Sequence, residues 1–160
     1  MTSQKRSFGE FNISHINPQQ LTKLISSTRT LEDLVKIYYD YYHDLNYIHI
    51  SCLWHNLAKI LKYDYNRKRW LDRQDKFIRD IIDKIFELLH EFKPQNLSNT
   101  VWAFATMNIK HDRLFDQVAQ EALKKLNTFN SQNLSNTIWA FATMNIKHDR
   151  LFNQVAQEAL

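Results

Sequence analysis

Glycine occurs once in this sequence, proline twice and cysteine once. A chain with so few turn-forming residues has no Gly-rich phosphate-binding loop, and it favours long helices joined by polar links. The lone cysteine excludes an internal disulfide, and no apolar run approaches the ~20 residues of a transmembrane helix. We therefore expect a protein without membrane contact in a reducing, cytoplasmic compartment, with an organellar location left open.

The balance of charge and hydrophobicity is that of a globular domain. Hydrophobic residues make up 44% of the 160-residue chain, and the formal net charge is +4. Such a mildly basic surface permits nucleic acid as a partner, although the sequence contains no strongly cationic stripe.

The sequence contains no pattern that predicts an enzyme, a cofactor or a metal site. His49, Cys52 and His55 recur every three residues, but a fourth zinc ligand is not evident. His111 is followed by an aspartate and looks catalytic in isolation, yet His148 repeats it in a near-identical copy. Helix capping explains such a repeated pair more simply than an active site written twice. We expect a non-enzymatic protein.

The strongest feature is an internal repeat with a period of 37 residues. Segments 95–123 and 132–160 align without a gap over 29 positions. The differences are Val101/Ile138 and Asp116/Asn153. Because the second copy stops at the equivalent of Leu123, we interpret the array as truncated within a repeat.

Each unit is predicted to be a pair of helices. Leu97, Val101 and Phe104 share one face of the first helix, and an amphipathic segment beginning near Asp112 forms the second. The short link "NIKH" makes the pair an αα-hairpin. One hairpin cannot bury its apolar face alone, so we predict an all-α fold, an α-solenoid of stacked αα-hairpin repeats.

The first half of the chain contains a worn version of the same pattern. "ISCLWHNLAKI" overlays "LSNTVWAFATM" at an offset of 47 residues, and the extra ten residues fit an insertion, "NRKRWLDRQD", between the two helices. We expect a flexible tail followed by a helical-repeat domain at 17–160. The predicted divisions are a tail at 1–16, degenerate helices at 18–46, a degenerate repeat at 47–92, a repeat at 93–129 and a truncated repeat at 130–160.

The segment "QNLSNTVWAFATMNIKHDRLFDQVAQEAL" resembles the octotricopeptide and heptatricopeptide repeats, whose first helix has the pattern Gln-x-Leu-x-Asn-x-x-Trp-Ala-x-Ala. The matching positions are Gln95, Leu97, Asn99, Trp102, Ala103 and Ala105, and again Gln132, Leu134, Asn136, Trp139, Ala140 and Ala142. The resemblance implies an α-solenoid that binds single-stranded RNA and acts on transcript stability, processing or translation.

An RNA-reading array needs polar side chains presented at a fixed pitch, with nearby cations for the phosphates. The candidate RNA-binding residues on these grounds are Asn56, Lys59, Gln95, Asn99, Thr106, Lys110, Gln132, Asn136, Thr143 and Lys147. The alternative for Asn99 and Asn136 is a structural role, with each amide bonded to the backbone of a neighbouring hairpin.

For the tryptophans too, a role in RNA binding competes with a structural one. Trp102 and Trp139 could stack on bases, but packing between repeats is the preferred interpretation because they border the apolar face. Trp70 lies in the densest basic stretch, which we interpret mainly as a solvated link between helices. Its weaker candidates for phosphate contacts are Arg67, Lys68, Arg69 and Arg73.

The sequence thus favours a non-catalytic module that binds single-stranded RNA, with protein partners left open. Two other hypotheses remain: an α-solenoid scaffold for protein–protein contacts, and a decayed fragment of a longer repeat protein.

Overall fold

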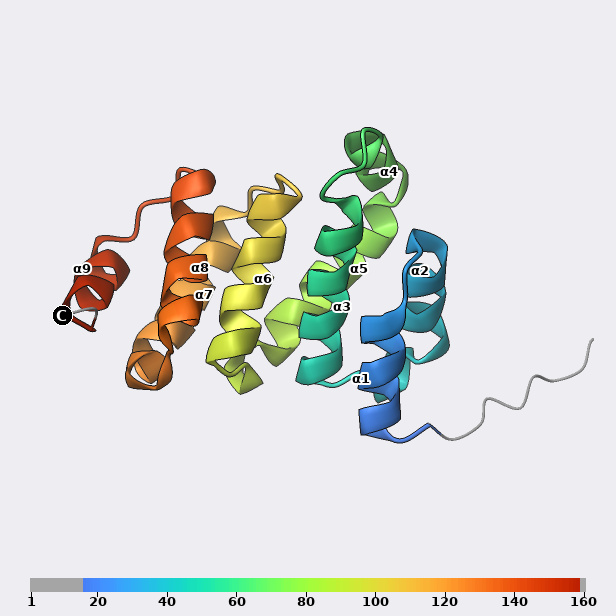
Figure 1. Cartoon of the computed structure of the whole chain (residues 1–160), viewed down its shortest axis with the longest axis horizontal. Coiled ribbons are helices and arrows are strands. Elements are labelled where there is room, and N and C mark those ends of the chain that lie inside the picture. The colour runs from blue at the N-terminus through green and yellow to red at the C-terminus, as the bar shows by residue number, and fades with distance from the viewer. Residues whose placement is uncertain (1–15, 159–160) are drawn as a thin grey trace, which may run out of the picture.

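The protein is all-α in a computed structural model that describes residues 16–158, so the predicted tail lies outside this range except for Ile16. The helices form two layers (Figure 1). The A layer contains α1 (Pro18–Ser27), α3 (Tyr47–Leu61), α6 (Pro94–Thr106) and α8 (Ser131–Thr143). The B layer contains α2 (Leu31–Asp40), α5 (Asp75–Leu88), α7 (Asp112–Lys125) and α9 (Asp149–Glu158). The predicted solenoid of stacked αα-hairpins is confirmed.

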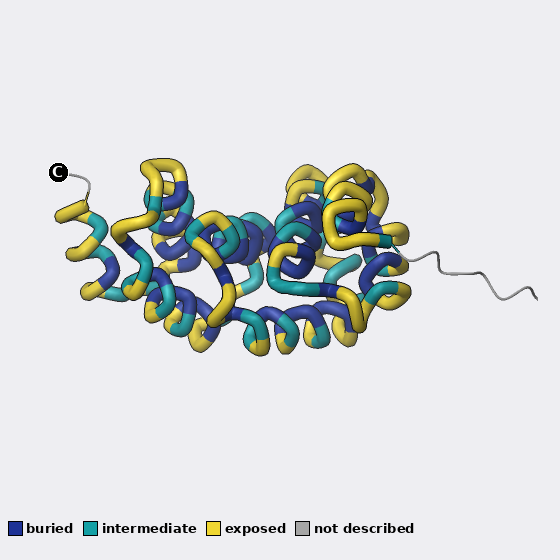
Figure 2. Tube along the Cα trace, turned by 90° about the horizontal axis from the view of Figure 1, so that it is seen from below, coloured by how far each residue is buried: buried dark blue, intermediate teal, exposed yellow. Residues whose placement is uncertain are grey.

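Shorter elements complete the chain. The predicted insertion is itself helical, since α4 (Arg67–Arg73) lies between α3 and α5. Short 3-10 segments follow three of the helices: η1 (Tyr42–Asp44), η2 (Leu89–Glu91) and η3 (Leu126–Thr128). Figure 2 shows the resulting section, with buried positions where the two layers face each other and exposed positions along both outer surfaces.

Several helices begin at polar caps that the sequence supplies locally. Asn17, Thr30 and Asn130 each accept a hydrogen bond from the backbone N–H three residues later. His111 and His148 do the same for α7 and α9, because each Nδ1 accepts the N–H of the leucine three residues on, at 3.2 Å. The two histidines are therefore caps, as the capping interpretation expected.

The A helices of the two copies end in the same left-handed turn. Asn108 has φ 57° and Asn145 has φ 53°. The N–H of Ile109 donates to Phe104 O at 2.9 Å, and that of Asn108 donates to Ala105 O at 3.1 Å, which is a Schellman motif. Asparagine tolerates this backbone conformation better than other non-glycine residues. A chain nearly without glycine thus ends these helices with asparagine.

A ladder of aromatic rings runs through the core and, from Phe104 onward, alternates between the layers. Trp54 of α3 contacts Phe104 of α6, with ring centroids 4.7 Å apart, and Phe104 contacts Phe115 of α7 at 6.1 Å. Phe115 then meets Phe141 of α8 at 5.0 Å, and Phe141 meets Phe152 of α9 at 6.1 Å. All but Phe152 are fully buried. Tilted and edge-to-face contacts of this kind stabilise a core beyond their buried area, so the ladder fixes how successive hairpins stack.

Polar contacts repeat along the same stack. In the A layer, Ser51 Oγ donates to Asn96 O of the next A helix at 3.4 Å. One repeat later, Asn133 Nδ2 donates to Ser98 Oγ at 3.4 Å, in a buried setting. Ser51 and Ser98 occupy equivalent positions, so the α3–α6 and α6–α8 junctions pair the same serine position with the same asparagine position.

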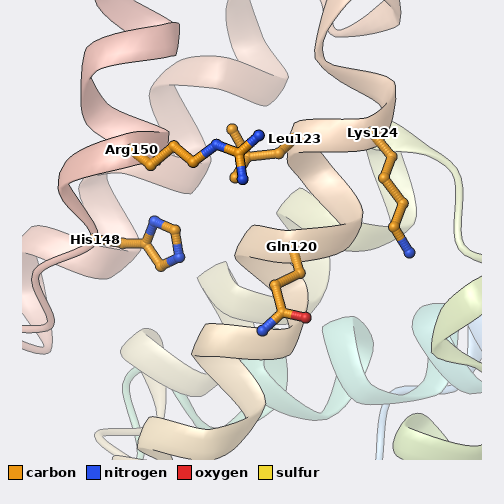
Figure 3. Close-up of a pocket in the computed structure, with 5 residues that line it drawn as sticks. All are labelled: Gln120, Leu123, Lys124, His148 and Arg150. Carbon is orange, nitrogen blue, oxygen red and sulfur yellow. The ribbon is translucent and has the colours of Figure 1, made fainter.

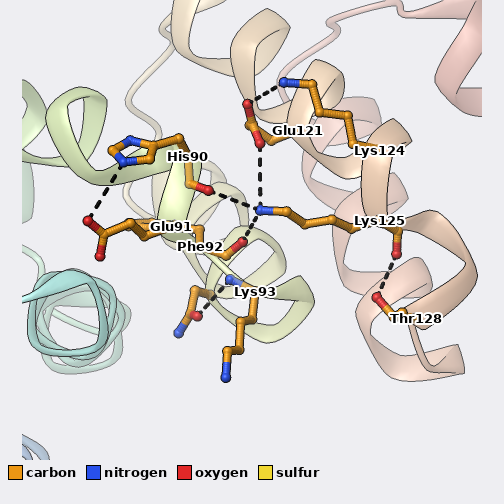
Figure 4. Close-up of polar contacts among 9 residues, drawn as sticks. His90, Glu91, Phe92, Lys93, Glu121, Lys124, Lys125 and Thr128 are labelled. Atoms are coloured by element: carbon orange, nitrogen blue, oxygen red, sulfur yellow. Dashed lines mark hydrogen bonds and ion pairs between the residues drawn. The ribbon is translucent and has the colours of Figure 1, made fainter.

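Lys125 joins one hairpin to the preceding one (Figure 4). Its Nζ donates to Phe92 O at 2.6 Å and to His90 O at 3.3 Å, and it lies 3.6 Å from Glu121 Oε2. The side chain of Lys125 is 29% exposed, whereas that of Lys124 is 66% exposed. The ammonium of Lys125 therefore satisfies backbone carbonyls where η2 ends, which would otherwise depend on water.

We expect Lys125→Met to lower the free energy of unfolding by about 1–2 kcal/mol, because it removes charge-assisted hydrogen bonds to two carbonyls. Lys124→Met is the matched control on the same helix. Its 2.9 Å pair with Glu121 is a surface ion pair, so we expect a loss below about 0.5 kcal/mol. Urea unfolding followed by circular dichroism measures both. Equal effects of the two substitutions would contradict the role assigned to Lys125.

Candidate nucleic-acid interface

The outer face of the A layer presents one row of side chains from each helix. On α6 and α8 the row consists of an asparagine, a tryptophan and a threonine, spaced by three and four residues so that they share a face. These residues are Asn99, Trp102 and Thr106 on α6, and Asn136, Trp139 and Thr143 on α8. At the equivalent positions α3 carries Cys52, His55 and Lys59. The three rows lie side by side because α3, α6 and α8 stack in that order (Figure 1).

A cleft of about 560 Å³ lies between the C-terminal halves of α6 and α8. Its lining combines aromatic rings, small polar groups and two cations from the α3–α4 connection. The lining residues are Lys62, Arg67, Trp102, Ala105, Thr106, Asn136, Trp139 and Thr143. None of these described lining residues is acidic, so the cleft is a locally positive surface with two aromatic walls.

The two tryptophans differ in how far the packing interpretation holds. Trp102 is half-buried, packs against the core and meets His55 of the preceding unit, as expected for packing between repeats, whereas Trp139 is 46% exposed. The neighbouring Ala103 and Ala140 are fully buried. Both tryptophans therefore present ring surface on the same face as the polar row.

The Trp102 ring lies between a histidine and a lysine. The ring of His55 meets it edge-on, with centroids 5.0 Å apart, and Lys62 Nζ lies 5.9 Å from its centroid. Burial lowers the pKa of His55 to about 4, and the Lys59 ammonium adds to that effect. Burial also raises the pKa of the Cys52 thiol. At neutral pH the imidazole is therefore uncharged, and the positive charge in this region comes from the lysines and Arg67.

Asparagine plays two separate roles in each A helix of the repeat. Asn96 accepts the Lys93 N–H at 3.0 Å, and the buried Asn133 accepts the Asn130 N–H at 3.2 Å. Asn99 and Asn136, three residues further on, make no side-chain hydrogen bond with residues 16–158. The structural alternative thus applies to asparagines that the sequence argument had passed over, and the amides of Asn99 and Asn136 remain available to a ligand.

Two of the predicted contacts must be withdrawn. Asn56 is buried, and its amide donates to Ile25 O and Thr28 O, both at 2.9 Å. It therefore ties the end of α1 to α3 and does not face a ligand. Thr106 lines the cleft, but its Oγ1 is buried without a hydrogen-bond partner among the described residues. By contrast, Thr143 at the equivalent position is exposed.

The remaining polar candidates are spread over the A face and its edge. Gln95 and Gln132 are exposed near the N-terminal ends of α6 and α8, away from the cleft, and Lys59 is exposed on α3. Lys110 and Lys147 line a second hollow of about 280 Å³ that also contains two aspartates. Lys110 Nζ is 3.8 Å from one of them, Asp112, so this hollow is less suited to a phosphate than the cleft.

The residues of the basic stretch on α4 differ in their surroundings. Arg67 lines the cleft, and its Nη1 donates to Thr106 O at 3.2 Å. Lys68 is exposed and pairs with Asp72 at 2.9 Å, while Arg69 and Arg73 are exposed on α4. Trp70 is half-buried with its ring centroid 6.3 Å from that of Phe77. It packs on the core, so it is not a stacking platform.

A larger hollow of about 600 Å³ lies between α7 and α9, on the B side (Figure 3). Gln120, Lys124, His148 and Arg150 line it with Leu123. Lys124 is paired with Glu121, and His148 caps α9 while its Nε2 lies 3.6 Å from Asp116 Oδ1. This hollow has no aromatic ring apart from a histidine that is already bonded. We therefore place the candidate interface on the A face.

In the part of the chain that the structure describes, no group of three or more histidine, cysteine, aspartate or glutamate side chains is placed to hold a metal ion. His49 is occupied by protein contacts: its Nδ1 accepts the Asn46 N–H at 3.1 Å, and its Nε2 lies 2.9 Å from Pro18 O. Among residues 16–158, no helix has the length and apolar character needed to span a membrane.

The fold and this face define an α-solenoid with a positively charged, aromatic-lined cleft between two near-identical repeats. The family model of the RNA-editing substrate-binding complex 6 protein, RESC6, matches residues 42–160. Since the match covers well over half of the chain, the protein belongs to the RESC6 family. No curated protein sequence matches the chain significantly. The resemblance to octotricopeptide and heptatricopeptide repeats stays a prediction.

The shifted pKa of His55 makes stability depend on pH. Between pH 6.5 and about 4 the unfolded chain binds a proton that folded His55 does not, so stability falls as the pH falls. We expect His55→Gln to remove about 1–2 kcal/mol of this acid destabilisation. Urea unfolding at several pH values measures the slope. His43→Gln, at an exposed position, is the control, and an unchanged slope in His55→Gln would refute the assignment.

Proposed function

We propose that this chain is a non-catalytic helical-repeat module that binds single-stranded RNA and acts in transcript stability, processing or translation. The cleft between α6 and α8 carries the proposal. It offers two partly exposed indoles, one amide that is not hydrogen-bonded to the described residues, and two cations on one surface. Single-stranded nucleic acid is bound by this combination of stacking platforms and backbone cations.

Each component of the cleft has a distinct task. Trp102 and Trp139 offer ring faces to unstacked bases, a contact worth about 1–3 kcal/mol per base and tolerant of sequence. Lys62 and Arg67 lie where phosphates would pass. Asn136 can donate to and accept from a base edge, which adds some sequence preference. Asn99, the equivalent residue on α6, would contact the base bound at the neighbouring unit. Since the polar rows of α6 and α8 have the same residues, both units should favour the same base.

Family membership supports an RNA-related role. The family takes its name from a protein of an RNA-editing substrate-binding complex. By extension, we propose that this chain works on RNA together with protein partners. The resemblance of α6 and α8 to the first helix of octotricopeptide repeats also points to single-stranded RNA as the ligand.

A protein scaffold is the second candidate function, and one observation favours it. Leu97 is fully buried by the stacking of neighbouring A helices, whereas its equivalent on α8, Leu134, is only half-buried. Ile138 likewise is half-buried where Val101 is fully buried. The far side of α8 thus has apolar surface that a protein partner could cover. Failure of a random RNA pool to bind at low salt would favour this function over RNA binding.

We expect Trp139→Ala to weaken binding of single-stranded RNA by about 5- to 150-fold, the equivalent of one lost stacking contact. Tyr39→Ala is the matched control, because Tyr39 is also 46% exposed but lies on α2 in the B layer. Fluorescence anisotropy with a labelled random-sequence RNA measures both. Trp139→Phe should retain most of the affinity. Equal affinities for Trp139→Ala and the unmodified chain would refute the cleft as the RNA site.

The two asparagine positions of α8 provide a second test. Asn136→Ala should weaken RNA binding and leave the melting temperature nearly unchanged, because the amide makes no hydrogen bond with the described residues. Asn133→Ala should lower stability by about 1 kcal/mol or more, since it removes the buried bond to Ser98 and the bond to the Asn130 N–H. Thermal melts and anisotropy distinguish the two effects. A large loss of stability in Asn136→Ala would assign that residue a structural role instead.

A further inference from the structure

The connection between α3 and α4 exposes two tyrosines to an unusual degree. Tyr63 is 83% exposed, and Tyr65 is fully exposed. They lie within a segment, residues 62–69, that we call the tyrosine turn. Four basic residues share the turn with them: Lys62, Arg67, Lys68 and Arg69.

The tyrosine turn is held in place by hydrogen bonds. The Asp64 N–H donates to Leu61 O at 3.1 Å, and the Asn66 N–H donates to Asp64 Oδ1 at 2.7 Å. At its far end, Arg67 Nη1 reaches across to Thr106 O of α6 at 3.2 Å. The turn is therefore anchored to the C-terminal end of an A helix, and its two tyrosines are presented from a fixed base.

This anchoring places the turn beside the cleft. A hollow of about 420 Å³ is lined by the turn itself, and Lys62 and Arg67 line both this hollow and the cleft. Lys62 Nζ lies 5.3 Å from the Tyr63 ring centroid and 5.9 Å from that of Trp102. One ammonium thus lies near an aromatic ring of each surface, so the two hollows adjoin at a shared pair of cations.

The charge of the second hollow also suits a nucleic-acid backbone. Its described lining contains the carboxylate of Asp64 and the cations of Lys62, Arg67 and Lys68. Asp64 is engaged by the backbone of the turn. The pair between Lys68 and Asp72 is exposed on both sides, and such surface pairs contribute little to stability, so the ammonium can exchange its partner for a phosphate.

We propose that the tyrosine turn is a second RNA subsite, which extends the cleft and binds the nucleotides flanking those held by Trp102 and Trp139. Tyr63 and Tyr65 stack on bases, and Lys62 and Arg67 bind the phosphates between the two subsites. The inference rests on the proposed function, because it treats the cleft as the first subsite. The long link between α3 and α5, which distinguishes the worn repeat from the regular ones, thereby lengthens the RNA track.

The test compares short and long RNA on four forms of the chain. The probes are labelled random-sequence RNAs of about 4 and about 12 nucleotides, lengths that span the site sizes typical of single-strand binders. The forms are the unmodified chain, Trp139→Ala, the double variant Tyr63→Ala/Tyr65→Ala, and the conservative double variant Tyr63→Phe/Tyr65→Phe. Because both tyrosines are exposed, their replacement should leave the melting temperature unchanged.

We expect the double alanine variant to bind the long RNA at least about fivefold more weakly and the short RNA within about twofold of the unmodified chain. The double phenylalanine variant should bind both RNAs normally, and Trp139→Ala should weaken both. If Trp139→Ala weakens binding but the double alanine variant does not, the second subsite is refuted and the proposed function stands. If Trp139→Ala has no effect on either RNA, the proposed function fails and this inference fails with it.

Discussion

The aromatic ladder is the contact on which the rest of the structure depends. Phe104, Phe115 and Phe141 are fully buried and alternate between the A and B layers, with each ring in contact with the next. Interiors are close-packed, so a ladder of large rings allows one rotation of each helix about its axis and few others. Once that rotation is set, the residues opposite the ladder are set as well. The outer row of asparagine, tryptophan and threonine on α6 therefore repeats in register on α8.

Polar groups support the stack where the rings do not reach. Lys125 closes the end of one hairpin against the next, and Asn133 bonds to Ser98 between neighbouring A helices. Both contacts satisfy groups that would be costly to leave unpaired in a partly buried junction. The same logic explains Asn108, which ends α6 in a left-handed turn in a chain with one glycine. These contacts are made by residues outside the outer row, and Asn99 and Asn136 of that row make no side-chain hydrogen bond with the described residues.

The cleft depends on a departure from the repeat as much as on the repeat itself. Two near-identical helices supply Trp102 and Trp139, but the cations come from the link after α3, where Lys62 precedes the insertion and Arg67 lies within it. Regular units alone would give a polar and aromatic face with little charge, in keeping with the net charge of only +4. The worn repeat concentrates positive charge at one end of that face. The proposed RNA site therefore lies where the regular and irregular units meet.

Much of the fold was predictable, because helical periodicity and an exact period of 37 residues depend only on local chemistry. The predicted hairpins, the capping role of His111 and the cap at Thr30 all follow from side chains and backbone a few residues apart. The site was predictable only in part. The asparagine positions of the polar row were identified, but Asn56 and Thr106 were wrongly included, and Trp139 was assigned to packing although it is exposed. A helical wheel gives the direction of a side chain and does not show what lies next to it.

The two copies of "LSNT-WAFATM" separate what residue order determines from what the tertiary structure determines. The sequence by itself determined that both segments are helices with the same apolar and polar sides, since that depends on residue order alone. Yet Thr106 has a buried hydroxyl where Thr143 is exposed, and Leu97 is fully buried where Leu134 is half-buried. α6 lies between two A helices, whereas α8 has an A-layer neighbour on one side only among the described residues. Burial is a property of neighbours, so only the stacking of helices could assign it.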